Sequence, residues 1–430
     1  MKPNIIPADY PGGSAERMPA MTRLAKALLL SQLKRIRHGR LRLIDGEFDQ
    51  TFGQMTPEGP IDVTIHVRDA QFYSDSVFAG TVGAGEAYIN GHWRCDDLTG
   101  LVRLMVVNRD LMDDVDSGWS RLSSPLRSLA HRLNGNDKRG SRRNIAAHYD
   151  LGNRFFELFL DETMAYSCGI FQHPAASLLE ASTAKFDAAC GKLALAPGQH
   201  LLEIGTGWGG LAIHAARKYG CRVTTTTISR EQYEFVRERI ARAGLGERIT
   251  LLLEDYRDLR GEYDALVSIE MIEAVGADYL DTYFRTCSGL LRPAGAMLLQ
   301  SITICDRLYD QAVRSVDFIK RFIFPGSFIP SVQFVIGSLA RATDLKLFHL
   351  EDIGPHYART LRLWRERFQS RLGEVRAQGY PESFVRMWEF YLCYCEGGFE
   401  ERQLGDVQML LLKPRSRRAA IATVHATAAR

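Results

Sequence analysis

The stretch AYSCGIF, residues 165–171, places a cysteine between small and aromatic residues. A thiol there could act as a nucleophile, bind a metal ion or fill space in a core. None of the eight cysteines forms a C-x-x-C pair, and their spacing is not that of a zinc site. No histidine partner for Cys168 is evident, so the default interpretation is a small buried side chain.

A glycine-rich loop follows in the stretch EIGTGWGG, residues 203–210. Gly205, Gly207 and Gly210 fit the dinucleotide pattern G-x-G-x-x-G, whereas Gly205, Gly207 and Gly209 fit G-x-G-x-G. Either arrangement lets the backbone turn sharply and approach a ligand closely at a helix N-terminus. A dinucleotide site also requires an acid at the end of the second strand, and the stretch TTTTIS has none there. The loop therefore favours a nucleoside ligand without a pyrophosphate.

Three further residues fit such a ligand. Glu203, just before the glycines, can hold a cationic amino-acid group, and Asp255 can accept a hydrogen bond from an adenine amino group. Tyr256 can stack on the ring. These residues fall at strand ends in chain order, as in the class I S-adenosylmethionine-dependent methyltransferases, which this arrangement resembles.

The elements around these residues alternate between short apolar runs and helical segments. This alternation predicts βαβ units and a parallel sheet covered on both faces. The expected strands are LLEIG (201–205), RVTTTTIS (222–229), ITLLLED (249–255), YDALVSIEMI (263–272) and GAMLLQSITI (295–304).

A chain of 430 residues exceeds one comfortable core, so we expect more than one domain. The expected parts are a disordered or basic helical segment (1–39), a small α+β domain (40–115), a basic linker (116–142), the catalytic domain (143–415) and a disordered tail (416–430).

Composition points to an ordinary globular protein, with 46% hydrophobic and 24% charged residues. No apolar run reaches the roughly 18 residues of a membrane span, and the N-terminus has no signal-peptide core, so we expect a cytoplasmic protein. Residues 23–42 and 127–144 are strongly basic. Such segments attract polyanions such as an anionic membrane face, although a solvated helix face and a linker explain them slightly better. We expect no nucleic-acid partner.

Longer blocks resemble a known family. NIAAHYDLGNRFFELFLDETMAYSCGIF (144–171), SIEMIEAVG (268–276), RFIFPGSFIPS (321–331) and YLCYCEGGFEERQLGDVQ (391–408) resemble, in order, the cyclopropane-fatty-acyl-phospholipid synthases and mycolic acid cyclopropane synthases. Residues 67–98 resemble the N-terminal domain of the bacterial phospholipid enzymes. The resemblance implies an α/β class I methyltransferase fold, Rossmann-like, with a mainly parallel seven-stranded sheet and a small N-terminal α+β domain.

The resemblance also implies an activity. In this family a cis double bond of an acyl chain attacks the methyl group of S-adenosylmethionine, and the resulting cation loses a proton as a cyclopropane ring closes. The expected substrate is an unsaturated membrane phospholipid. The residues implied to bind S-adenosylmethionine are Tyr166, Ser167, Glu203, Gly205, Gly207, Gly209, Thr227, Ile228, Gln232, Asp255 and Tyr256.

Family members bind bicarbonate as the proton acceptor. On the matching positions the resemblance implies that Cys168, Glu273, the backbone at Ile302 and Tyr357 hold this ion, with Cys395 in the same pocket. The family's histidine contact is replaced here by Gln300, whose amide can donate a hydrogen bond but cannot become cationic.

Alternatives remain open. If ring closure is disfavoured, loss of a different proton leaves a methylated, still unsaturated chain. A soluble small-molecule methyltransferase and a catalytically silent S-adenosylmethionine-binding protein are the other classes. Glu270 lies three residues before Glu273, and we assign a function to Glu273 only. We further expect docking on an anionic bilayer through residues 23–43, peripheral attachment to the inner membrane face and a homodimer.

Overall fold

The computed structural model describes residues 18–55, 60–109 and 151–419. The predicted linker (116–142), the basic segment at 127–144 and most of the predicted tail lie outside the described residues.

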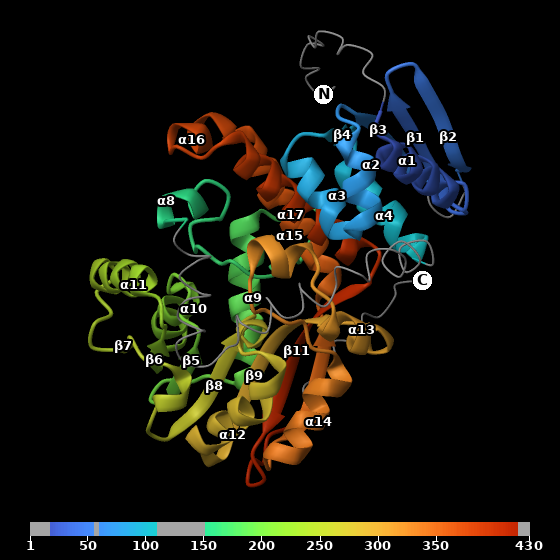
Figure 1. The fold of residues 1–430 in the computed structure, drawn as a ribbon. Helices are drawn as coiled ribbons and strands as arrows, with labels where there is room; N and C mark the ends of the chain where they lie inside the picture. Colours follow the sequence, from blue (N-terminus) through green and yellow to red (C-terminus); the bar gives the residue numbers. More distant parts are fainter. Residues whose placement is uncertain (1–17, 56–59, 110–150, 420–430) are drawn as a thin grey trace, which may run out of the picture.

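The N-terminal part is built on a four-stranded sheet of order β2-β1-β3-β4 (Figure 1). Alternating burial along β1 turns Leu41 and Leu43 into the core and leaves Arg40 and Arg42 exposed, as expected for a sheet with one solvated face. The strands are β1 (Gly39–Asp45), β2 (Phe48–Gln54), β3 (Asp62–Val67) and β4 (Trp93–Cys95). The helices are α1 (Ala20–Leu33), α2 (Gln71–Phe78), α3 (Gly80–Ile89) and α4 (Leu98–Val107).

Helix α1 belongs to this part of the fold although it precedes the predicted domain start at residue 40. It buries Ala25, Leu29 and Leu33 at helical spacing in the same hydrophobic cluster as the sheet.

The catalytic part contains a seven-stranded sheet of order β10-β11-β9-β8-β5-β6-β7, in which β11 alone runs antiparallel to its neighbours. The predicted mainly parallel seven-stranded sheet is confirmed. Its strands are β5 (His200–Ile204), β6 (Arg222–Thr226), β7 (Ile249–Leu252), β8 (Tyr263–Ile269), β9 (Leu291–Ile304), β10 (Lys346–Asp352) and β11 (Leu404–Leu412).

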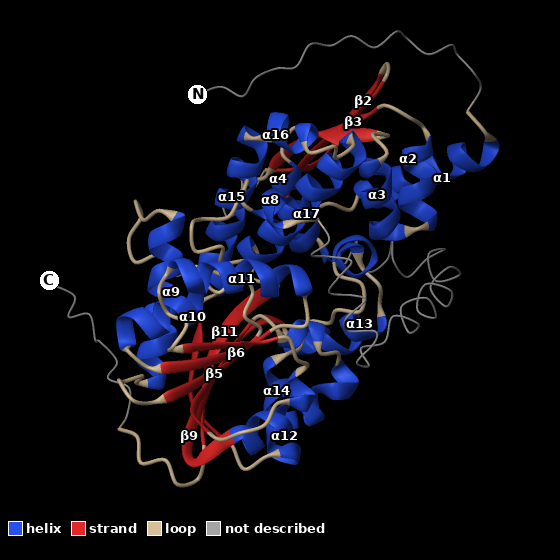
Figure 2. Ribbon diagram, turned by 90° about the vertical axis from the view of Figure 1, so that its left-hand side faces the viewer, coloured by secondary structure: helices blue, strands red, loops and turns tan. Residues whose placement is uncertain are grey.

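Helices cover both faces of this sheet (Figure 2). The helices of the catalytic part are α8 (Asn153–Phe156), α9 (Leu178–Leu193), α10 (Gly210–His214), α11 (Arg230–Arg242), α12 (Leu280–Leu290), α13 (Tyr309–Arg314), α14 (Val332–Ala342), α15 (Gly354–Ser370), α16 (Leu372–Ala377) and α17 (Glu382–Glu400).

Helices α15 and α17 lie between the N-terminal part and the seven-stranded sheet (Figure 1), and α17 packs against α3 and α4. Trp388 on α17 shares one hydrophobic cluster with Leu41 and Phe72 of the N-terminal part and with Phe155 of the catalytic part. The two parts are therefore joined by a common core. The predicted boundaries at 115 and 143 stay predictions.

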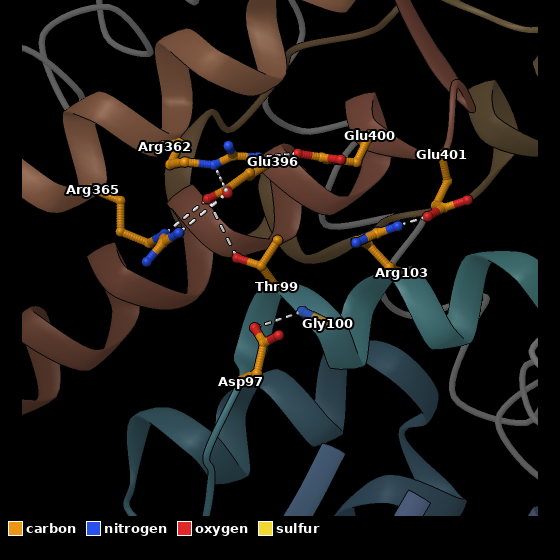
Figure 3. A network of polar contacts seen from close by, with 9 residues as sticks. All are labelled: Asp97, Thr99, Gly100, Arg103, Arg362, Arg365, Glu396, Glu400 and Glu401. Atoms are coloured by element: carbon orange, nitrogen blue, oxygen red, sulfur yellow. Dashed lines mark hydrogen bonds and ion pairs between the residues drawn. The ribbon is translucent and has the colours of Figure 1, made fainter. Parts of the chain in front are cut away.

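A polar network at this junction centres on Glu396, which is 2% exposed (Figure 3). Its carboxylate accepts hydrogen bonds from Arg365 Nε at 2.8 Å and Arg362 Nε at 3.2 Å on α15. Thr99 Oγ1 on α4 donates to it at 3.3 Å. Arg103 on α4 pairs with Glu401 at 2.7 Å beside it. Because a buried carboxylate must be paired, this network fixes how α4 sits on α15 and α17.

The basic stretch at 23–42 meets acids from other elements. Lys26 pairs with Asp45 at 2.5 Å, and Arg40 and Arg42 pair with Asp62 and Asp49. Part of the positive charge of this segment is therefore compensated by these acids in the folded protein. Within the described ranges, no helix is both long and apolar enough to cross a bilayer.

We predict that Glu396→Ala lowers the free energy of unfolding by about 3 kcal/mol, since it removes the shared acceptor of the partly buried Arg365 and of the buried Thr99 hydroxyl. Chemical denaturation followed by circular dichroism measures this. The matched control is Asp49→Asn, which breaks the exposed pair with Arg42 and leaves the unfolding free energy nearly unchanged. Equal effects of the two substitutions would contradict the assigned role of Glu396.

Candidate active site

A cavity of about 1420 Å³ lies at the carboxyl ends of the central strands. It sits where the strand order reverses beside β5, the position at which open α/β sheets bind ligands. Its walls come from both parts of the chain. The N-terminal contribution is apolar and includes Leu33, Leu41, Phe72, Trp93, Leu101 and Met105.

The glycine loop closes one end of this cavity. Gly205 and Gly207 have φ of 96° and 51°, the left-handed region that favours glycine, and both line the cavity. A Cβ on Gly207 would meet nothing within 4 Å, so the loop leaves room for a ligand. Gly209 also has a positive φ, but it lies outside the lining residues and packs against Val236 of α11.

Glu203 lies one residue before the end of β5, lines this side of the cavity and is 4% exposed. Thr225 Oγ1 donates to its Oε2 at 2.6 Å. Burial raises the pKa of Glu203 to about 8. A cationic group placed beside it would stabilise its ionised form.

The residues expected around adenine also line the cavity. Asp255 lies after β7 and pairs with Arg257 at 2.7 Å, while Tyr256 begins a short 3₁₀ turn (Tyr256–Asp258). Thr227 Oγ1 donates to Gln232 Oε1 at 2.8 Å and thereby joins the end of β6 to the start of α11. Ile228 completes this wall.

Tyr166 and Ser167 face the cavity from the loop before α9. The Tyr166 hydroxyl shares a hydrogen bond with Tyr391 at 2.8 Å. Ser167 Oγ accepts from Lys185 Nζ at 2.7 Å. Lys185 is 1% exposed, and burial lowers the pKa of its amino group.

Glu270 follows β8 and occupies the centre of the site. Its Oε1 accepts from the Cys168 backbone N–H and from Gln300 Nε2, each at 2.8 Å. Its Oε2 accepts from the Tyr357 hydroxyl. Its φ is 47°, a left-handed conformation that is strained for a residue with a side chain and that recurs at functional sites. Three donors from three elements therefore converge on one carboxylate.

The orientation of the Gln300 amide is fixed from outside the cavity. Lys192 Nζ can only donate, and it donates to Gln408 Oε1 at 2.5 Å. Gln408 Nε2 then donates to Gln300 Oε1 at 2.9 Å. The Gln300 NH2 group is left for Glu270 and for Asp406 Oδ2, which it reaches at 2.9 Å. Gln300 is thus a donor to acidic groups.

Glu273 lies beside Glu270 on a short turn (Ile272–Ala274). Its Oε1 accepts from the Ile302 backbone N–H at 2.7 Å and from Ser301 Oγ at 2.8 Å. Its buried Oε2 has no hydrogen-bond partner among the described residues. Burial, and then the neighbouring Glu270, raise the pKa of Glu273 to about 8. Both glutamates line the cavity.

Cys168 contributes its backbone rather than its thiol. Its side chain is fully buried, with Sγ 3.3 Å from the Gly169 carbonyl oxygen and 3.7 Å from that of Ile353, and it does not line the cavity. Gln300 is likewise fully buried behind Glu270. Cys395 lines the cavity, where burial raises the pKa of its thiol.

Sequence reasoning missed Glu270, Lys185 and Asp406 as members of this site. The E-x-x-E spacing at Glu270 was visible, but it fits a pair of surface carboxylates equally well. Asp406 lies in β11, far along the chain, and is fully buried. Burial and the neighbouring Glu270 raise its pKa well above the usual range.

With this geometry in place, comparisons with known proteins are informative. The sequence model of the family described as mycolic acid cyclopropane synthetase matches residues 136–409. The tuberculostearic acid methyltransferase of Mycobacterium tuberculosis is 37% identical over 415 residues, covering 93% of this chain and 96% of that protein. The cyclopropane-fatty-acyl-phospholipid synthase of Escherichia coli K12 is 36% identical, covering 82% of this chain and 87% of that protein.

Solved structures agree. Mycolic acid cyclopropane synthase CmaA1, complexed with S-adenosylhomocysteine (SAH) and CTAB, matches with a TM-score of 0.60 and 32% identity, covering 63% of this chain and 98% of that one. Coclaurine N-methyltransferase, at 21% identity and a TM-score of 0.57, shares the fold. The chain is an S-adenosylmethionine-dependent methyltransferase, and it belongs to the mycolic acid cyclopropane synthetase family.

Proposed function

We propose that this enzyme methylates the cis double bond of an unsaturated lipid acyl chain and releases a methyl-branched, still unsaturated chain without closing a ring. The single observation that carries the proposal is the two-ended cavity. Glu203 and the glycine loop form its polar end, the glutamate pair lies beside them, and apolar N-terminal residues line part of the remainder.

The preference for an open product rests on two features. The relative that covers 93% of the chain is named a methyltransferase of tuberculostearic acid, not a cyclopropane synthase. In addition, Gln300 stands where the resemblance implies histidine, and its amide is directed at Glu270.

The cofactor-binding residues and the cavity walls have separate roles in this reaction. When bound, S-adenosylmethionine supplies the methyl group that bonds to an alkene carbon, so that a cation remains on the acyl chain. Glu203, Asp255, Thr227 and Gln232 would hold the cofactor. The buried, largely apolar cavity keeps water from the cation, and a base must then remove a proton from the chain.

Cyclopropane formation is the second candidate, favoured by the 36% identity to a protein named cyclopropane-fatty-acyl-phospholipid synthase. Both products need the same methyl transfer. They differ in which C–H bond supplies the electron pair that neutralises the cation. A soluble small substrate is disfavoured, because apolar residues such as Leu41, Phe72 and Trp93 line the cavity beyond the cofactor end.

A phospholipid substrate and peripheral docking on an anionic membrane extend this proposal. Met21 and Leu24 of α1 are 58% and 48% exposed, and Arg23, Lys34 and Arg37 are exposed on or just after the same helix. Exposed apolar and basic side chains together suit an interfacial helix. A homodimer remains a prediction.

We predict that the purified enzyme, given S-adenosylmethionine and vesicles of monounsaturated phospholipid, adds one CH2 per modified chain. Mass spectrometry before and after mild catalytic hydrogenation checks this. An open, unsaturated product takes up hydrogen and a cyclopropane ring does not. A hydrogenation-resistant product would select the second candidate, and absence of any mass gain would contradict acyl methylation.

We predict that Glu203→Gln weakens binding of S-adenosylhomocysteine about 10- to 100-fold, since a hydrogen bond to a charged group contributes about 1.5–3 kcal/mol. In the cofactor-free enzyme the pKa of Glu203 is about 8, so this carboxyl is mostly protonated near pH 7. Binding of the cationic ligand then releases a proton, and wild-type affinity rises as pH increases toward 8.

Calorimetry in buffers of different ionisation enthalpy measures this proton release. The variant should lose it, whereas Glu234→Gln on the exposed face of α11 should keep both affinity and proton release. Unchanged proton release in Glu203→Gln would contradict the assignment.

We predict that replacing Arg23, Lys34 and Arg37 by Gln weakens flotation with anionic vesicles, each charge contributing about 1 kcal/mol near the surface. The matched control replaces Arg40 and Arg42, which already pair with acids, and should bind nearly as wild type. Equal loss in both variants, or no loss in either, would exclude docking through this face.

A further inference from the structure

The resemblance implies a bound bicarbonate as proton acceptor, and the structure allows a test of whether the site fits it. The implied contacts are Cys168, Glu273, the Ile302 backbone and Tyr357, with Gln300 at the histidine position. A bicarbonate ion needs hydrogen-bond donors turned toward it and no uncompensated negative charge beside it.

Those donors are already engaged by side chains of the chain itself. The Cys168 N–H, the Gln300 amide and the Tyr357 hydroxyl all donate to Glu270. The Ile302 N–H donates to Glu273. A bicarbonate placed there would have to displace Glu270 and would lie next to a second carboxylate. The site as built does not fit the ion.

We propose that the Glu270 carboxylate takes the place of bicarbonate and is the enzyme's own proton acceptor. The proposal rests on the proposed methylation of acyl chains and adds the residue that completes it. Three donors hold the carboxylate at the cavity wall, and the fully buried Asp406 lies beside it and also interacts with it.

The proton transfer needs only groups that are already present in the site and the substrate. A C–H bond of the cationic acyl chain breaks, and its electron pair forms the new C=C bond or, in the second candidate, the closing C–C bond. The proton goes to a Glu270 oxygen, which returns it to solvent after the product leaves. No oxidant, reductant or further reactant is required.

The backbone at Glu270 makes one substitution especially informative. Its φ of 47° suits glycine better than any residue with a side chain, so Glu270→Gly removes the carboxylate without straining the chain. The variant would present the Cys168 N–H, the Gln300 amide and the Tyr357 hydroxyl to an empty, anion-sized space. Glu270→Gln fills that space with a neutral amide and is the matched control.

The experiment compares wild type, Glu270→Gly and Glu270→Gln in degassed, bicarbonate-depleted buffer and after addition of bicarbonate or formate. We expect wild-type turnover to be independent of bicarbonate. Glu270→Gly should lose roughly 100-fold or more, as expected for loss of a general base, and regain activity with added anion. Glu270→Gln should be slow and should not respond to anions.

A second readout does not depend on turnover. Binding of ¹³C-bicarbonate, followed by NMR line broadening, should be absent in wild type and present in Glu270→Gly. S-adenosylhomocysteine affinity and the thermal midpoint should match wild type in both variants, which separates loss of a base from misfolding.

Two outcomes would overturn the proposal. Wild-type turnover that requires bicarbonate, or wild-type binding of the labelled ion, would restore bicarbonate as acceptor. Full activity of Glu270→Gly without any anion would remove Glu270 from proton transfer. If wild type transferred no methyl group to any acyl chain, the proposed function would fail, and the ¹³C binding result would still decide whether Glu270 fills the anion site.

Discussion

The site depends on the cost of burying carboxylates. Glu203, Glu270, Glu273 and Asp406 lie close to the carboxyl ends of the central strands, where each needs donors or a proton to be tolerated. The surrounding architecture meets this requirement with backbone N–H groups, amides, hydroxyls and the buried Lys185. The same desolvation that makes these acids expensive raises their affinity for protons, which is the property that a proton acceptor requires.

Sequence alone predicted the sheet well, and the residues expected to bind the cofactor, except Gly209, line one cavity. Strand ends and glycine spacing are local features, so Glu203, Gly205, Gly207 and Asp255 could be placed from short stretches. The centre of the site could not be read in this way. Whether Glu270 faces solvent or the interior depends on α15 and β11, which follow far along the chain. That Cys168 presents its backbone N–H rather than its thiol to Glu270 could not be predicted, because residue type does not reveal side-chain direction.

The N-terminal part is a wall of the cavity as well as an attached domain. The core at Trp388 and the network at Glu396 hold it against α15 and α17, and α15 also carries Tyr357. The apolar lining supplied by Leu41 and Phe72 is therefore held in a fixed position relative to the glutamate pair. Charge compensation between Lys26, Arg40 and Arg42 and acids on the strands was invisible in sequence, because the partners belong to other strands.

The hydrogen-bonded series Lys192–Gln408–Gln300 allows only one direction for its hydrogen bonds. Two neighbouring amides have two self-consistent arrangements, and in the reverse one Gln300 would turn its oxygen toward Glu270. A lysine at the outer end makes that reversal impossible, since it offers no acceptor. Lys192 thus excludes the second arrangement of the two amides, so the Gln300 NH2 group, and not its oxygen, faces Glu270.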